Sequence, residues 1–99
     1  MKLHAYRTTF AIFDKGNDSP ICDAVLRVVV ADARRPSSPV NCVLIRCKDG
    51  ATFGLNFDNM SRAVDGVAHF LENTGYDIST DSPIVRLKSW LFEILSANQ

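Results

Sequence analysis

Hydrophobic and polar residues alternate along most of the first half of the chain. The period of two residues is typical of a half-buried β-strand. This alternation predicts four strands, over residues 4–13, 22–32, 41–48 and 51–57. Asp49-Gly50 lies between the last two strands and favours a type I′ turn, which requires a positive φ at both central residues. We therefore expect the third and fourth strands to form a hairpin.

The alternation also divides each predicted strand into a core face and an outer face. In the third strand one face carries Val43, Ile45 and Cys47, and the other carries Cys42, Leu44 and Arg46. We assign the first of these faces to the core. The outer face of the sheet would then be unusually apolar, with Val25, Val29, Cys42 and Leu44.

Two amphipathic helices are predicted after the fourth strand. Asp58 or Asn59 is a suitable N-cap for the first helix, which continues to about Asn73 and is followed by Gly75 as the C′ residue. Ser82-Pro83 supplies an N-cap and an N1 proline for the second. Apolar residues of this second helix cover an arc of roughly 220°, which is more than one sheet face can cover.

The order of these elements indicates an α+β fold: a four-stranded antiparallel sheet followed by two helices packed on one face, in a single domain over residues 1–99. The apolar surface left over on the last helix predicts a homodimer with this helix at the interface. The alternative is that this helix is sandwiched between the sheet and the first helix. A content of 46% hydrophobic and 22% charged residues is typical of a globular protein.

The chemistry of the sequence favours a non-enzymatic protein. His4 and His69 are isolated, and the cysteines at 22, 42 and 47 lack the spacing of a zinc site and are odd in number. The glycines do not form a phosphate-binding loop. We expect no catalytic site, metal or cofactor. Without a membrane-length apolar run or a signal-peptide core, we expect a soluble cytoplasmic protein that does not contact membranes.

Basic and acidic residues balance in number but not in position. Residues 1–48 carry eight Lys and Arg against four Asp, a net charge of +4, and residues 49–99 carry three against seven, a net charge of −4. We expect Arg7, Arg27 and Arg46 to share the outer face, with Arg34 and Arg35 at its rim. Guanidinium groups bind phosphate or carboxylate oxygens in pairs. The simpler alternative is that these arginines are solvated or paired with aspartates.

The element order from Tyr6 to about Asn73 resembles the repeat of the Pur family and the core of PC4-like single-strand DNA binders. This resemblance implies single-stranded nucleic-acid binding on the arginine face, which is our alternative hypothesis. Our first hypothesis is a homodimeric protein–protein interaction module, acting as an adaptor, inhibitor or regulatory protein. Its partner-binding residues would be Trp90, Leu91 and Phe92 as anchors, Lys88 at the rim, and Arg34 and Arg35 against an acidic partner.

Overall fold

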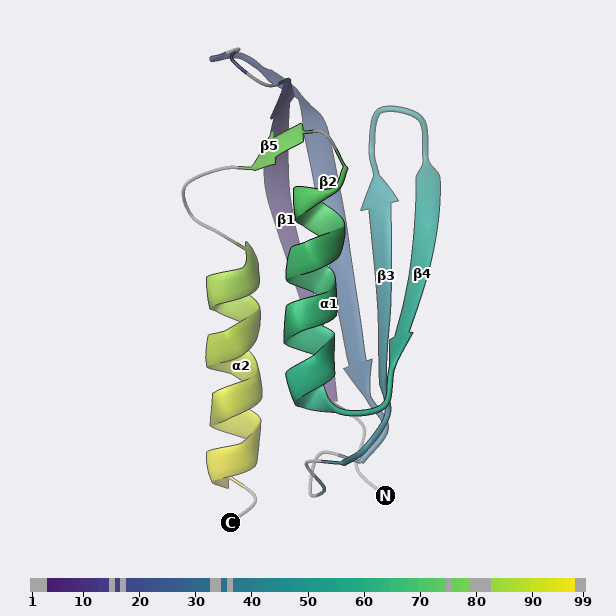
Figure 1. Ribbon diagram of the computed structural model, residues 1–99, viewed down its shortest axis with the longest axis vertical. Helices are drawn as coiled ribbons and strands as arrows, with labels where there is room; N and C mark the ends of the chain where they lie inside the picture. The colour runs from purple at the N-terminus through teal and green to yellow at the C-terminus, as the bar shows by residue number, and fades with distance from the viewer. Residues whose placement is uncertain are drawn as a thin grey trace.

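The computed structural model describes residues 4–14, 16, 18–32, 35, 37–74, 76–78 and 83–97. In chain order the elements are β1 (His4–Asp14), β2 (Pro20–Val30), β3 (Val40–Arg46), β4 (Ala51–Phe57), α1 (Met60–Glu72), β5 (Tyr76–Ile78) and α2 (Pro83–Ala97) (Figure 1). The predicted α+β fold is confirmed, because an antiparallel sheet of β1 to β4 is followed by two helices that contact it. Arg34, Gly75 and Ser82, to which we assigned roles, lie outside the described residues.

The sheet has the order β4-β3-β2-β1-β5. Strands β1 to β4 follow one another as an antiparallel meander, and α1 then carries the chain back across the sheet to its other margin (Figure 1). There β5 pairs antiparallel with the end of β1, with Ile12 opposite Ile78. The sequence did not predict β5, because three residues are too few for an alternation to be recognised.

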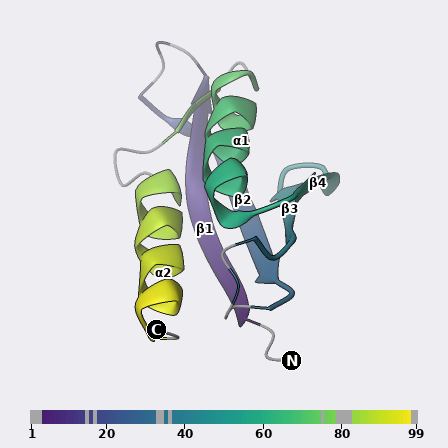
Figure 2. The same cartoon turned by 60° about the horizontal axis from the view of Figure 1, so that its bottom comes forward.

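Both helices lie on the same side of the sheet (Figure 2). Helix α1 contacts β3, β4 and β5, whereas α2 contacts α1 and β1. The other side of the sheet faces away from the helices, so two layers of structure make one covered face and one open face.

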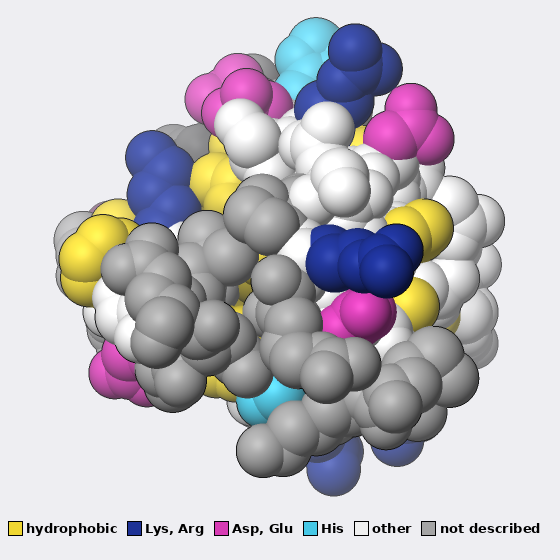
Figure 3. All heavy atoms as spheres, turned by 90° about the horizontal axis from the view of Figure 1, so that it is seen from below, with side chains coloured by type: hydrophobic (Ala, Val, Ile, Leu, Met, Phe, Trp, Pro, Cys, Tyr) yellow, Lys and Arg dark blue, Asp and Glu magenta, His cyan; other side chains and the backbone are white. Residues whose placement is uncertain are grey.

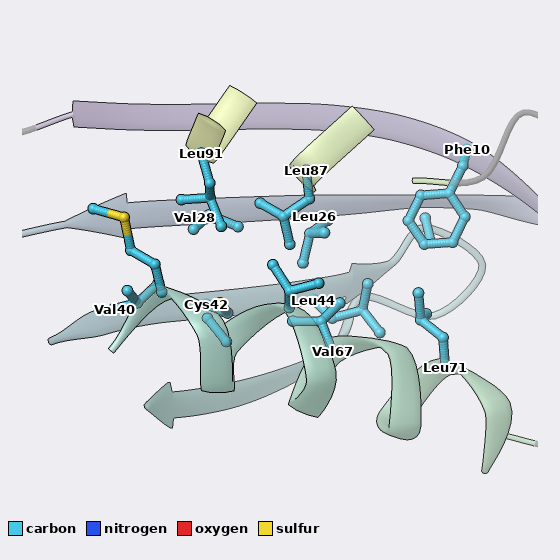
Figure 4. Packing of buried hydrophobic residues seen from close by; sticks show 14 of the residues in the cluster. Phe10, Leu26, Val28, Val40, Cys42, Leu44, Val67, Leu71, Leu87 and Leu91 are labelled. Atoms are coloured by element: carbon cyan, nitrogen blue, oxygen red, sulfur yellow. The ribbon is translucent and has the colours of Figure 1, made fainter. Parts of the chain in front are cut away.

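The core lies between these layers (Figure 4). Alternate residues of the central strands point towards the helices, and the most completely buried of them are Leu26, Val28, Val30, Val40 and Cys42. Helix α1 contributes Val67 and Leu71, and α2 contributes Leu87 and Leu91 (Figure 4). Apolar side chains from four strands and two helices therefore form a single cluster.

The faces of β3 are the reverse of our assignment. Arg27 of β2 is opposite Val43, and Leu26 is opposite Leu44. Since cross-strand neighbours point to the same side of a sheet, Leu44 shares the buried face of Leu26. Val40, Cys42 and Leu44 thus face the helices, and the apolar outer face consists of Val25, Val29, Val43 and Ile45.

The predicted β3–β4 hairpin is present, but its turn is not type I′. Strand β3 ends at Arg46, so four residues rather than two connect it to Ala51. Gly50 has a φ of 71°, whereas no other residue type in the described part of the chain has a positive φ. The Gly50 N–H donates to the Arg46 carbonyl at 2.8 Å, which closes the longer loop.

Asn59 is the N-cap of α1, one of the two candidates that the sequence offered. Its backbone is extended, with φ −158° and ψ 171°, and its Oδ1 accepts a hydrogen bond from the Arg62 N–H at 2.9 Å. This bond satisfies one of the N–H groups that the first helical turn leaves without a partner.

Gly66 lets the aromatic ring of Phe57 lie against the backbone of α1. A Cβ atom at position 66 would overlap that ring, with the Phe57 Cε1 and Cζ atoms as the nearest neighbours. Replacing a helical glycine by alanine ordinarily stabilises a protein by about 1 kcal/mol. Here the gain is opposed by overpacking.

We predict that Gly66→Ala lowers the free energy of unfolding by roughly 1–3 kcal/mol, measured by urea denaturation. Ser61→Ala, on the exposed side of the same helix, is the matched control and should change it by less than about 0.5 kcal/mol. In a Phe57→Leu background the cost of Gly66→Ala should shrink. A higher midpoint for Gly66→Ala than for the wild type would contradict this account.

Candidate functional site

Most of the apolar residues of α2 pack against the rest of the protein. Leu91 is only 4% exposed and lies in the core with Leu87 (Figure 4). The Trp90 ring stacks on that of Tyr6 in β1, with centroids 5.0 Å apart and an angle of 28° between the planes. The helix packs against β1 and against the side of α1, so it lies beside α1 on the sheet and not between α1 and the sheet, as our alternative had placed it (Figure 2). Two of the three predicted partner anchors, Trp90 and Leu91, are packed within the chain.

The third anchor, Phe92, points away from this core. Its side chain is 72% exposed, and Val85, seven residues earlier, is 65% exposed. Residues seven apart on a helix lie almost in line, about 10 Å from one another, with the exposed Lys88 between them. Hydrophobic side chains reach the surface on the α2 side of the molecule (Figure 3). We call Val85, Lys88 and Phe92 the α2 ridge.

A groove of about 320 Å³ lies beside the α2 ridge, between the two helices. Its lining is mainly apolar and comes from both helices: Met60, Ser61, Val64, Asp65, Lys88, Leu91 and Phe92. Lys88 and Asp65 add one charge of each sign. Phe92 therefore stands at the rim of a depression of a size that could receive a side chain from another protein.

Two arginines face each other on the open side of the sheet. Arg7 of β1 is directly opposite Arg27 of β2, and both side chains are exposed. Like charges in directly opposite positions destabilise a sheet. Within the described residues, neither guanidinium has an ion-pair or hydrogen-bond partner. Basic side chains protrude from this side of the molecule at the lower edge of Figure 3.

Arg46 does not join this pair, contrary to our expectation. It is opposite Ala24 of β2 and Ala51 of β4, and it therefore lies on the helix-facing side of the sheet. Its Nε and Nη2 atoms donate to the two carboxylate oxygens of Asp49, at 3.0 and 2.7 Å. The predicted patch of three arginines is thus reduced to Arg7 and Arg27. Arg35 is exposed, and its Nε atom lies 3.6 Å from the Oδ2 atom of Asp32.

A second cavity, of about 280 Å³, lies between the sheet and the C-terminal half of α1. Its walls include Phe53 and Phe70, whose ring centroids are 5.4 Å apart, and Arg46 lies at its edge. The fork of Arg46 is already bound to Asp49. The Arg46 guanidinium at the edge of this cavity therefore stabilises the β3–β4 hairpin.

The chemistry at the described residues does not converge on a reaction centre. Neither hollow has a histidine or cysteine among its described lining residues. Burial raises the pKa of the Cys42 thiol to about 11, which keeps it protonated and unreactive near neutral pH. No group of three metal-binding side chains is found in the described ranges. In the same ranges neither helix has the length and apolar character that crossing a membrane requires.

No family model, curated protein or solved structure matches the chain.

The Arg46–Asp49 pair makes a measurable prediction. Arg46 donates to the Asp49 carboxylate, as does the Ala51 N–H at 3.0 Å, and these bonds lower the pKa of Asp49 to about 2. We predict that Arg46→Ala raises this pKa towards the ordinary value of about 3.9, measured by NMR titration of the side-chain carboxyl carbon. Arg62→Ala, which removes a looser ion pair at 3.7 Å to Asp58, should leave it unchanged.

The sign of the accompanying stability change follows from linkage. Because the folded-state pKa is lowered, the pair contributes its full stabilisation at a pH above the unfolded value of about 3.9. This stabilisation is lost as the pH falls through about 2. An unchanged Asp49 titration in Arg46→Ala would show that the hairpin backbone alone sets the pKa.

Proposed function

We propose that the chain is a non-enzymatic protein-binding module of the cytoplasm, acting as a homodimeric adaptor, inhibitor or regulatory protein, and that it contacts its partner through the α2 ridge. The observation that carries this proposal is the exposure of Phe92 at the rim of the interhelical groove. Large aromatic side chains next to apolar depressions are typical of the residues that dominate binding energy.

The packing of Trp90 and Leu91 supports this role indirectly. Because both residues are anchored on the inner side of α2, the helix presents Phe92 in a fixed orientation. A preorganised anchor binds at a lower entropic cost than one on a mobile segment. A partner helix could place its own apolar residues in the groove and against Phe92. Lys88 and Asp65 would then fix its direction through charges of opposite sign.

We predict that a photo-reactive amino acid at position 92 forms a covalent product with one discrete partner protein in the native host. The same amino acid in place of Glu72 should not form this product, because Glu72 is exposed at the C-terminal end of α1 and the groove lies at the N-terminal end. With the partner purified, Phe92→Ser should weaken binding by about 30-fold, the change expected for a hot-spot residue of roughly 2 kcal/mol. Ser89→Ala, an exposed change on the same helix, is the control. If Phe92→Ser and Ser89→Ala bind the partner equally well, the α2 ridge is not part of the interface.

The Arg7–Arg27 pair favours a second candidate function, the binding of single-stranded nucleic acid on the open side of the sheet. Two unneutralised guanidinium groups side by side attract phosphate oxygens. Asn41, which hydrogen-bonds Asn56 on the same face, adds a polar border. Base stacking would need exposed aromatic rings, and Phe53 lies on the other face, opposite Leu44.

If this second function is correct, a labelled single-stranded oligonucleotide should bind at low salt, and combining Arg7→Ala with Arg27→Ala should weaken binding by at least about tenfold. Loss of two phosphate contacts should also reduce the salt dependence of log affinity by a slope of about 1.4. Arg46→Ala is the control, since its guanidinium lies on the opposite face. Fluorescence anisotropy measures both quantities. An equal loss in Arg46→Ala would exclude the open face as the site.

A further inference from the structure

One margin of the sheet is an unprotected strand. Strand β4 pairs with β3 along one edge, and no strand of the described part of the chain pairs with its other edge. In Figure 1, β4 stands at one margin of the sheet, with β3 on one side and no element on the other. Such an edge presents a row of backbone N–H and C=O groups that can pair with another strand.

Strand β4 lacks the features that ordinarily block this pairing. Charged residues, prolines, bulges or very short length protect natural edges. The seven residues of β4 include no charge and no proline, and their pairing with β3 runs without a bulge from Val40–Phe57 to Arg46–Ala51. The opposite margin differs, because β5 pairs with one end of β1 and α2 packs against β1.

We propose that β4 is the contact between two copies of this chain, paired antiparallel about a two-fold axis at Gly54. Gly54 is the central residue of the strand. Pairing about it places Phe53 opposite the partner subunit's Leu55, and Thr52 opposite the partner subunit's Asn56. Apolar positions on the helix side then face apolar positions, and polar positions on the open side face polar ones. The two sheets become one, with all helices on the same side.

The sequence of β4 is self-complementary in the way that this symmetry demands. A two-fold axis brings each nearby side chain close to its own copy, so a charge at the axis would repel itself. None is present in β4. The nearest carboxylates, Asp49 and Asp58, lie just beyond the strand ends, and each is paired with an arginine of its own chain, Arg46 or Arg62.

Phe53 gains cover from this arrangement. Its side chain is 38% exposed and touches Phe70 of α1 on one side. In the dimer the partner subunit's Leu55 borders it on the other. Cross-strand aromatic–aliphatic pairs of this kind stabilise sheets, and the symmetry supplies two of them. The proposal rests on the homodimer of the proposed function and names its contact. Helix α2 lies at the opposite side of the molecule from β4 (Figure 1), so this contact does not compete with partner binding on α2.

Charge placement on β4 tests both the contact and its register. Thr52 and Asn56 point to the open side and are exposed, so lysines there should not disturb the core. The Thr52→Lys/Asn56→Lys variant places lysine opposite lysine twice in the dimer. We expect the wild type to sediment as a dimer at tens of micromolar and this variant as a monomer with an unchanged circular dichroism spectrum. The urea midpoint of the wild type should rise with protein concentration, because only the folded state dimerises, and that of the variant should not. Thr9→Lys, an exposed change on the same face of β1, is the matched control and should remain dimeric.

Mixing two variants of opposite charge should restore dimerisation. The Thr52→Asp/Asn56→Asp variant should also be monomeric alone, and an equimolar mixture with the lysine variant should form a heterodimer, because each lysine then faces an aspartate. A monomeric wild type, a dimeric lysine variant, or a mixture that stays monomeric would each overturn the proposal. If Phe92→Ser rather than the lysine variant abolishes the dimer, the contact lies on α2. A monomeric wild type would also remove the homodimer from the proposed function, whereas photo-crosslinking at position 92 tests partner binding through the α2 ridge separately.

Discussion

The burial of one face of β2 determines on which side of the sheet the neighbouring side chains lie. Leu26, Val28 and Val30 are completely enclosed between the sheet and the helices. A shift of one residue in β1 would turn the buried Phe10 and Ile12 towards the open side. Arg27 follows the buried Leu26 and therefore points to the open side, where it lies opposite Arg7, whereas Arg46 lies opposite the buried Ala24 on the helix side. The repulsion between Arg7 and Arg27 on the open face is therefore a consequence of the packing on the helix-facing side.

Helix α2 has more apolar residues than the small core of this protein can bury. A chain of 99 residues buries a limited fraction of its surface, and α2 extends the core over the part of β1 that α1 does not reach. Leu87 enters the central cluster, and Trp90 closes its margin by stacking on Tyr6. Once these contacts are made, the geometry of the helix leaves Val85 and Phe92 on the side away from the sheet. The exposed ridge therefore remains after the monomer has satisfied its own core.

Local features of the fold were predictable from the sequence, and long-range features were not. The hairpin at Asp49-Gly50 and the cap at Asn59 depend on neighbouring residues, and both are present. The orientation of β3 depends on its partner strand, and since apolar residues occupy both of its faces, alternation alone could not decide between them. The type of turn depends on where β3 ends. In the same way, the width of the apolar arc on α2 showed that surface was in excess, but the Tyr6–Trp90 contact joins residues at opposite ends of the chain.

The same meander that builds the sheet also makes its two margins different. Because α1 crosses from β4 to the β1 side before β5 and α2 form, the last third of the chain covers the β1 margin and leaves β4 uncovered. An open edge of this composition is a liability in a monomer, since nothing in its side chains prevents pairing with unrelated strands. Occupation by a second copy removes that liability at both edges at once. It also places the two α2 ridges at the far ends of one continuous sheet, where each is accessible to a partner without obstruction from the other.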